Sequence, residues 1–209
     1  MKVLGIDTTR KSANVFLFDT NDANLSCFLK MGNDIKHSEG LFLFVEKVLE
    51  DNNISLEEID AFACVVGPGS FTGIRVGMSA IKGFNKVLNK STVVLNSFDI
   101  LLPEVKSGLI ILNSTNTSCY YAKVEKSEIV DIGVVEKSKI IEMANCKEVV
   151  LLKEEQDMIN LEYNNCKIVE NIDNLYKSCV IKKMNSGDYG EFVPYYLQLS
   201  QAERNLKDE

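Results

Sequence analysis

The stretch that decides the fold of this chain is a glycine-rich turn after the apolar run Ala61–Val66, and it reads Gly67-Pro68-Gly69-Ser70-Phe71-Thr72-Gly73-Ile74-Arg75-Val76-Gly77. Its first seven residues include three glycines and a proline, so the backbone turns sharply before a helical pattern resumes. A glycine-rich turn between a strand and a helix either cradles an anion or lets two backbones pack closely. Which of these applies decides whether the protein is a catalyst or a partner for one.

The turn matches neither of two common phosphate-binding loops. A Walker A loop continues with lysine and a hydroxyl residue, whereas Ile74 and Arg75 follow the glycine here. The dinucleotide fingerprint would need a glycine at Thr72. Gly73, Gly77 and Ala80 are spaced by four and three residues, so they share one helix face that another element can approach closely. We expect packing there, with ligand contact by the loop as the open alternative.

The composition predicts one large domain or two small ones. The chain has 209 residues, 45% of them hydrophobic, and no apolar stretch approaches the roughly 18 residues of a membrane span. Residues 1–7 indicate a strand rather than a signal peptide, so a cytoplasmic location is expected. The six cysteines form no C-x-x-C pair, which indicates reduced, structural thiols.

The charge argues against unaided binding to nucleic acid. The net charge is −7, whereas proteins that hold phosphate backbones present a basic patch. The compact basic clusters are Arg10-Lys11 and Lys182-Lys183, and we expect both to be solvated loop charges. If the protein acts on RNA, another protein is expected to hold the RNA.

The first hundred residues predict three strands, a helix, a buried strand, the glycine-faced helix and one more strand. In the first helix Leu43 projects away from the apolar stripe and Phe44 widens it, which is typical of a helix with two neighbours. That stripe consists of Leu41, Phe42, Val45, Val48 and Leu49. The expected elements are Lys2–Asp7, Ala13–Asp19, Leu25–Met31, Ser38–Asp51, Ile59–Val66, Thr72–Asn89 and Thr92–Leu95.

The second half repeats the order of the first. After a shift of 106 residues, Val3–Thr9 lies over Leu109–Thr115, and two further strands follow in the same order. A βββ-α-β-α-β unit present twice is the plan of the α/β, actin-like ATPase (RNase H-like) fold, with the second unit reduced. We expect subdomains at 1–102 and 103–190, with the segment 191–209 returning to the first.

Several motifs together resemble the TsaB (YeaZ) family. They match in order and at family spacing, most strongly over residues 1–100, and the glycine-rich turn is the most specific of them. The matching segments are Gly5-Ile6-Asp7-Thr8-Thr9, His37-Ser38-Glu39, Val66–Gly77, Pro194-Tyr195-Tyr196-Leu197 and Ala202-Glu203-Arg204.

The resemblance implies a non-catalytic partner of the paralogue TsaD in tRNA threonylcarbamoyladenosine (t6A) synthesis. TsaD carries two metal-binding histidines at positions that correspond to Ser97 and Leu101, and neither residue is a strong metal ligand. No catalytic residue, metal or cofactor is therefore expected. Asn113 stands where many relatives have aspartate and Gln198 where they tend to have arginine, which argues against autonomous nucleotide hydrolysis.

The resemblance also implies partners. We expect a heterodimer with a TsaD homologue, cooperation with the ATPase TsaE, contact with tRNA only through the complex, a homodimer when alone and no membrane contact. The expected partner interface consists of Leu43, Phe44, Gly73, Arg75, Gly77 and Ala80. A vestigial nucleotide side would consist of Asp7, Thr8, Thr9, Gly67 and Gly69.

Alternative roles remain for single residues and for the whole chain. Asp7 either orients a phosphate-bound metal or caps the turn through Thr8 and Thr9, and the cap is favoured. Arg75 reaches a partner carboxylate or is solvated, and His37 makes an ordinary loop contact or binds a ligand. The main alternative function is an autonomous actin-fold ATPase or small-molecule kinase. A peptidase lacks the histidines it would need, and a two-metal nuclease lacks clustered carboxylates.

Overall fold

The computed structural model describes residues 1–22, 26–30, 37–161 and 163–198, and for residues 37–39 the backbone alone. Contacts divide the chain into two units, which are described separately. Unit 1 comprises Met1–Ser97 and Tyr176–Tyr195, and unit 2 comprises Phe98–Leu175 and Tyr196–Glu209.

Unit 1 is built on a five-stranded mixed sheet of order β3-β2-β1-β4-β5. The first three strands form an antiparallel meander, and β4 and β5 then continue the sheet in parallel to β1. A parallel neighbour needs a crossover connection, and the two long helices supply the two crossovers. The strands are β1 (Lys2–Asp7), β2 (Asn14–Asp19), β3 (Ser26–Lys30), β4 (Ala61–Val65) and β5 (Ser91–Leu95).

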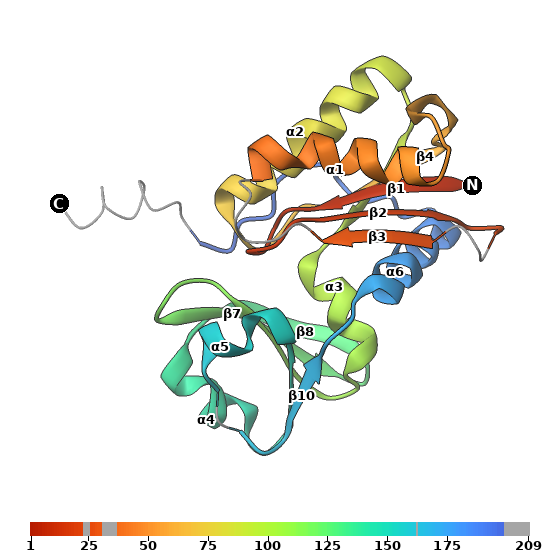
Figure 1. Ribbon diagram of the computed structural model, residues 1–209. Helices are drawn as coiled ribbons and strands as arrows, with labels where there is room; N and C mark the ends of the chain where they lie inside the picture. The colour runs from red at the N-terminus through yellow and green to blue at the C-terminus, as the bar shows by residue number, and fades with distance from the viewer. Residues whose placement is uncertain (23–25, 31–36, 162, 199–209) are drawn as a thin grey trace. The chain divides into compact units, whose positions relative to one another are not determined.

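Helices cover both faces of this sheet (Figure 1). Helix α1 (His37–Asp51) and helix α2 (Phe71–Leu88) lie on one face, where α2 packs on β1 and β4 and α1 packs on β2 and β3. On the opposite face lies α6 (Asp173–Ser186), whose Tyr176 ring stacks on Phe16 at a centroid distance of 4.7 Å. Because both faces are covered, every residue of β4 is buried, as the continuous apolar run predicts.

Unit 2 repeats the strand order in a second sheet, β10-β9-β6-β7-β8. The meander β6-β7-β8 is antiparallel, and β9 and β10 follow in parallel to β6. Strand β6 begins 106 residues after β1, which is the shift expected from the sequence. The strands are β6 (Gly108–Asn113), β7 (Ser118–Glu125), β8 (Glu128–Glu136), β9 (Glu148–Leu152) and β10 (Cys166–Val169).

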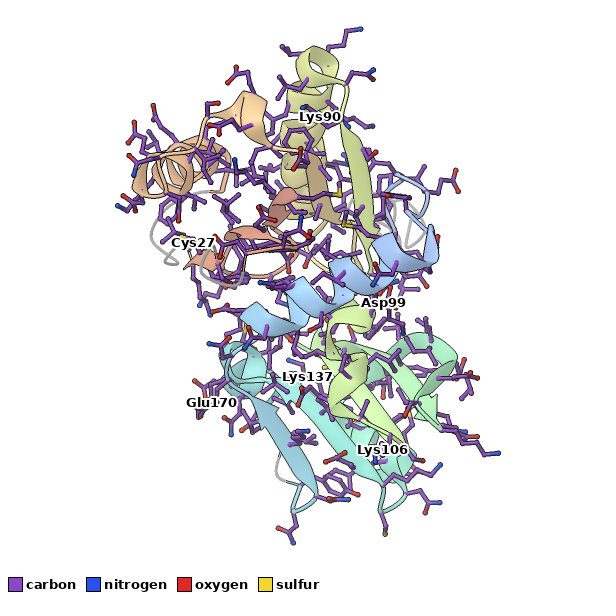
Figure 2. The ribbon with its side chains drawn as sticks, turned by 90° about the vertical axis from the view of Figure 1, so that its right-hand side faces the viewer. Cys27, Lys90, Asp99, Lys106, Lys137 and Glu170 are labelled. Atoms are coloured by element: carbon purple, nitrogen blue, oxygen red, sulfur yellow. The ribbon has the colours of Figure 1, made fainter. Side chains whose placement is uncertain are left out.

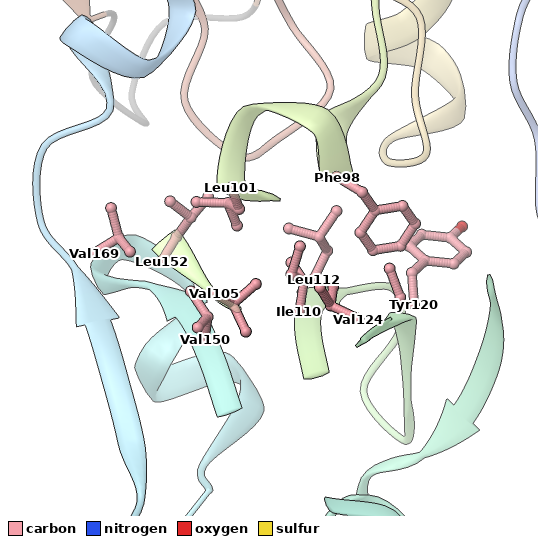
Figure 3. Close-up of a cluster of buried hydrophobic side chains, with 11 residues drawn as sticks. Phe98, Leu101, Val105, Ile110, Leu112, Tyr120, Val124, Val150, Leu152 and Val169 are labelled. Carbon is pink, nitrogen blue, oxygen red and sulfur yellow. The ribbon is translucent and has the colours of Figure 1, made fainter. Parts of the chain in front are cut away.

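Side-chain alternation along the second sheet gives unit 2 two apolar clusters, one on each face. Figure 3 shows the first, to which α3 (Ser97–Leu101) contributes Phe98 and Leu101. Its other members include Ile110, Leu112, Tyr120, Val124, Val150, Leu152 and Val169. The second cluster contains Leu109, Ile111, Cys119, Ile140, Ala144, Val149, Leu151 and Ile159.

The crossover helices of unit 2 are short. Helix α4 (Ile140–Ala144) precedes β9 and α5 (Gln156–Ile159) precedes β10, where unit 1 has α1 and α2. Three-residue 3₁₀ turns precede α4 and α5. The expected fold class is confirmed: the chain has a two-subdomain, actin-like fold whose second subdomain is reduced.

The observed boundaries of the two units differ from the expected ones at two segments, each of which belongs to the other unit. Residues 98–101 follow β5 in the chain but belong to unit 2, and residues 176–190 follow β10 but belong to unit 1. The expectation placed the first of these segments in subdomain one and the second in subdomain two, because the chain has no polar linker to mark either crossing. Of the expected returning segment 191–209, residues 191–195 belong to unit 1 and 196–198 to unit 2, and 199–209 lie outside the described residues.

Among the described helices, none combines the length and the apolar character that crossing a membrane requires.

Candidate functional site

The outward face of α1 carries large apolar side chains. Phe42 is 55% exposed and Leu43 is 64% exposed, whereas Leu41, Val45 and Val48 are buried against the sheet. The expectation that Phe42 belongs to the core-facing stripe is wrong, because its ring lies against Phe84 of α2 and remains more than half exposed, whereas positions 41, 45, 48 and 49 are buried. Phe44 is half-buried.

Helix α2 extends this apolar surface. Phe42 meets Phe84 edge to face at a centroid distance of 5.9 Å, and Phe84 stacks on Phe62 of β4 at 5.7 Å. The exposed aromatic ring is therefore continuous with the core beneath it. Farther along α2, Val87 is 82% exposed. We call Phe42, Leu43, Phe84 and Val87 the α1–α2 face.

The small residues of α2 point the other way. Gly73, Gly77 and Ala80 are all buried. A Cβ on Gly73 would collide with the carbonyl oxygen of Thr8, and one on Gly77 would collide with the Thr8 hydroxyl. Their size lets α2 lie directly on the turn after β1, so we correct the expectation that these residues line an outer surface.

Arg75 lies on the exposed side of the same helix. Its guanidinium carbon stands 4.4 Å from the centroid of the Phe71 ring, one turn earlier. This cation–π contact holds the side chain along the helix. The side chain of His37 lies outside the described residues.

The polar turn after β1, residues 7–12, is closed around a carboxylate. Asp7 Oδ1 accepts hydrogen bonds from the Thr9 amide at 2.9 Å and from the Thr9 hydroxyl at 2.6 Å, so the expected local cap is observed. Thr8 Oγ donates to the carbonyl of Gly73 at 2.6 Å, and the Ser70 amide donates to the carbonyl of Thr9 at 2.6 Å. The turn is thereby bonded to the first residues of α2.

The glycines of the decisive stretch serve this packing. Gly67 has φ +119°, in the region that favours glycine, and a Cβ there would strike the carbonyl oxygen of Tyr195. A Cβ on Gly69 would strike the carbonyl oxygen of Thr9. Within unit 1, Gly67 and Gly69 therefore pack closely against the segment that ends at Tyr195 and against the turn after β1, respectively.

Arg10 is a buried part of the turn. Its side chain is 3% exposed, and its Nη1 contacts Asp7 Oδ2 and the hydroxyl of Tyr176. The expectation that Arg10 is a solvated loop charge is therefore wrong. Its neighbour Lys11 is exposed, so the basic pair divides between the interior and water. The sequence gives no signal for Tyr176, which belongs to α6 and lies 166 residues after Arg10.

The actin-like fold implies a nucleotide and its magnesium ion, so the donor set of the turn is a direct test. Both oxygens of Asp7 are occupied by groups of this chain, and the carboxylate is paired with a guanidinium. Within the described residues no three histidine, cysteine or acidic side chains are grouped as a metal would need. The residues present do not fit a metal-bound phosphate.

The other positions compared with catalytic relatives also carry no strong metal ligand. Ser97 is buried, and its hydroxyl lies 3.4 Å from that of Thr9. Leu101 lies in the first apolar cluster of unit 2. In the turn after β6, the backbone N–H of Asn113 donates to Glu155 Oε2 at 3.3 Å, and Gln198 bridges the hydroxyls of Ser114 and Ser118.

The two units differ in charge. Figure 2 labels charged side chains of both, among them Lys90 of unit 1 and Asp99 and Glu170 of unit 2. By sequence, the ranges 1–97 and 176–195 carry 13 acidic and 13 basic side chains. Residues 98–175 carry 14 acidic and 8 basic side chains, a balance of −6. Most of the net charge of the chain therefore belongs to unit 2, and the unit that bears the α1–α2 face is neutral.

Comparison with known proteins defines the class. The TsaD family model, described as tRNA N6-adenosine threonylcarbamoyltransferase, matches residues 34–164, which is more than half of the chain. The chain belongs to this family, and the predicted kinship with the TsaB (YeaZ) proteins is confirmed.

Individual relatives agree with this assignment. The tRNA threonylcarbamoyladenosine biosynthesis protein TsaB of Buchnera aphidicola is 24% identical over 134 residues, which cover 60% of this chain and 58% of that protein. TsaB of Escherichia coli is 32% identical over 83 residues, which cover 40% and 35%. The chain thus spans little more than half of the one relative's own length and about a third of the other's.

A solved structure extends the likeness of fold to nearly the whole chain. It is an uncharacterized Pseudomonas aeruginosa protein described as similar to the peptidase YeaZ. The TM-score is 0.72 at 16% identity, and the match covers 94% of this chain and 99% of that one.

Proposed function

We propose that this chain is a non-catalytic subunit of the assembly that makes N6-threonylcarbamoyladenosine at position 37 of tRNA. Its role is to bind a TsaD homologue through the α1–α2 face and so to activate that enzyme, together with the ATPase TsaE. It uses no cofactor of its own and works in the cytoplasm.

The α1–α2 face is the observation that carries this proposal. Phe42, Leu43 and Val87 are more than half exposed, and Phe42 is anchored on the buried ring stack through Phe84. Aromatic and aliphatic side chains held on rigid helices are typical of the centre of a protein interface. The same face can pair with a second copy of the chain, which supports a homodimer when the TsaD homologue is absent.

The polar turn supports a non-catalytic role. Asp7 already has its oxygens occupied, and Ser97 and Leu101 replace the ligands expected in a catalytic paralogue. The main alternative, an autonomous ATPase or small-molecule kinase, would need Asp7 to hold a metal, and no described contact favours that role.

The charge distribution supports contact with tRNA only through the complex. By sequence, unit 2 carries 17 acidic and 10 basic side chains, a balance of −7, and unit 1 is neutral, so neither offers the excess of cations that a phosphate backbone requires. The TsaD homologue is therefore expected to hold the RNA.

Size-exclusion chromatography with light scattering tests the proposal, using this chain alone and mixed with the TsaD homologue from the same source. We expect a one-to-one complex. Leu43→Glu should weaken it at least about tenfold, since it places a charge within an apolar interface. Val130→Glu is the matched control, because Val130 is 53% exposed but belongs to unit 2, and it should leave the complex intact.

Three results would overturn the proposal. The first is the absence of any complex between the two wild-type proteins. The second is ATP hydrolysis by the isolated chain that Asp7→Asn abolishes, which would favour the ATPase alternative. Equal loss of binding in both charge variants would place the interface elsewhere than on the α1–α2 face.

A further inference from the structure

The carboxylate of Asp7 is saturated by groups of its own chain. A carboxylate offers about four lone-pair sites. Oδ1 accepts from the amide and the hydroxyl of Thr9, at 2.9 and 2.6 Å. Oδ2 accepts from Arg10 Nη1 and from the hydroxyl of Tyr176, the latter at 2.5 Å. Within unit 1, no position on this carboxylate is left for a metal ion.

The charge of Asp7 is balanced as well. Asp7 and Tyr176 are fully buried and Arg10 is 5% exposed, so the ion pair lies in the interior of unit 1. A lone carboxylate there would be strongly disfavoured, because burial removes its hydration. Arg10 therefore occupies the electrostatic role that a bound cation fills at an open carboxylate.

Tyr176 completes the arrangement from the other face of the sheet. Its hydroxyl donates to Asp7 and accepts from Arg10 Nη1 at 3.1 Å. Burial, and next the negative charge of Asp7, raise the pKa of this phenol well above its ordinary value. The hydroxyl thus keeps its proton and remains a donor.

We propose that Arg10 is a built-in counter-cation that, with Tyr176, takes the place of a divalent cation at Asp7 and closes the first turn to metal-bound phosphates. The guanidinium of Arg10 supplies the positive charge that a ligand-bound cation would supply in an actin-like ATPase site. This inference goes beyond the proposed function and does not depend on it.

The consequence lies in the contacts of the turn. Thr8 and Thr9 are bonded to Gly73 and Ser70 at the start of α2. The turn also fixes Tyr176, and through its ring stacking on Phe16 it fixes the first part of α6 within unit 1. The ion pair with Arg10 therefore holds the turn, and with it the start of α2, in one conformation in the absence of a nucleotide.

The test is a thermal-unfolding titration of the full chain with Mn²⁺ alone and with Mg²⁺·ATP. The wild type should show the same melting temperature with and without either probe. Arg10→Gln removes the cation and leaves Asp7 without a counter-charge, so Mn²⁺ should raise its melting temperature by several degrees in a concentration-dependent way. Arg10→Lys is the matched control, since it retains a cation and should not respond.

Each outcome decides the inference. A response of the wild type to either probe that Asp7→Asn removes would overturn it, because Asp7 would then be open. An Arg10→Gln variant that responds no more than the wild type would also overturn it, because Arg10 would not be what closes the turn. If the glutamine variant does not fold with or without the probes, the same titration is carried out on Arg10→Met, which keeps a long side chain without the charge.

Discussion

The two polar turns of this chain occupy the same place in their sheets and are built from opposite chemistry. The turn after β1 begins with Asp7 and closes around a buried ion pair with Arg10. The turn after β6 begins with Asn113 and closes through hydroxyls and an amide, with Thr115 Oγ1 2.7 Å from Ser118 Oγ. A repeated topology therefore does not preserve the chemistry of the repeat.

The helices near the two turns differ in the same way. Helix α2 has 18 residues, and glycines let it pack directly on the turn after β1. Its counterpart in chain order, α5, has four residues and no glycine. The glycine stripe thus occurs on the long helix that packs closely on a turn, and it is absent from the short one. It also explains why the distinctive sequence motifs are concentrated in unit 1.

The largest expected effect comes from exchanging the residues that begin the two turns. Asp7→Asn removes the buried carboxylate that pairs with the guanidinium of Arg10, and we expect a loss of about 3–5 kcal/mol in the free energy of unfolding. Asn113→Asp puts a charge on a side chain whose Oδ1 is buried and whose nitrogen lies 3.9 Å from Met158 Sδ, and it should cost about 1–3 kcal/mol. Urea unfolding of both variants measures the difference. Equal losses would mean that the two turns are not distinguished by charge.

A second, smaller effect separates the buried from the exposed glycines of α2. Gly73→Ala forces a Cβ onto the backbone carbonyl of Thr8 and should cost about 1–3 kcal/mol. Gly83→Ala is the matched control, because no atom lies within 4 Å of the added Cβ. It should increase the free energy of unfolding by up to about 1 kcal/mol, since alanine favours the helix. The comparison fails if Gly73→Ala is as well tolerated as the control.

The smallest effect is a pH dependence in unit 2. Burial raises the pKa of the Cys119 thiol from 9.0 to about 11. A raised pKa contributes stability that is fully present below about pH 9 and is lost as the pH rises towards 11. We expect Cys119 to contribute a loss on the order of 1–2 kcal/mol between these values.

Urea unfolding at pH 8.5 and at pH 10.5 measures this loss, and Cys119→Ala should reduce it. Cys146→Ala is the control, because Cys146 is exposed, and it should retain the wild-type dependence. If Cys119→Ala loses as much stability as the wild type over this range, buried Cys119 is not its source.

Much of the fold follows from local patterns. The predicted strand Lys2–Asp7 has the bounds of β1, and the predicted helix Thr72–Asn89 differs from α2 by one residue at each end. The shift of 106 residues places the repeat of β1 at β6. The exchange of segments between the units could not be predicted. Residues 98–101 and 176–190 continue their chain without any linker signal, and only long-range packing assigns them to the other unit.

The site was predicted in part. The exposure of Leu43 follows from its position opposite the apolar stripe, whereas Phe42 lies against Phe84 of α2, a contact that the pattern of α1 alone does not indicate. Arg10 appears in sequence as an ordinary charge beside Lys11. Its burial depends on Tyr176, a partner 166 residues away, which no local pattern indicates.

Hydrogen–deuterium exchange of the wild-type chain, alone and mixed with the TsaD homologue, tests most directly that the α1–α2 face is the binding surface. The account predicts slower amide exchange in the complex over residues 37–51 and 71–88, with no change over β8 of unit 2. Slower exchange over β8 with the two helices unchanged would contradict it.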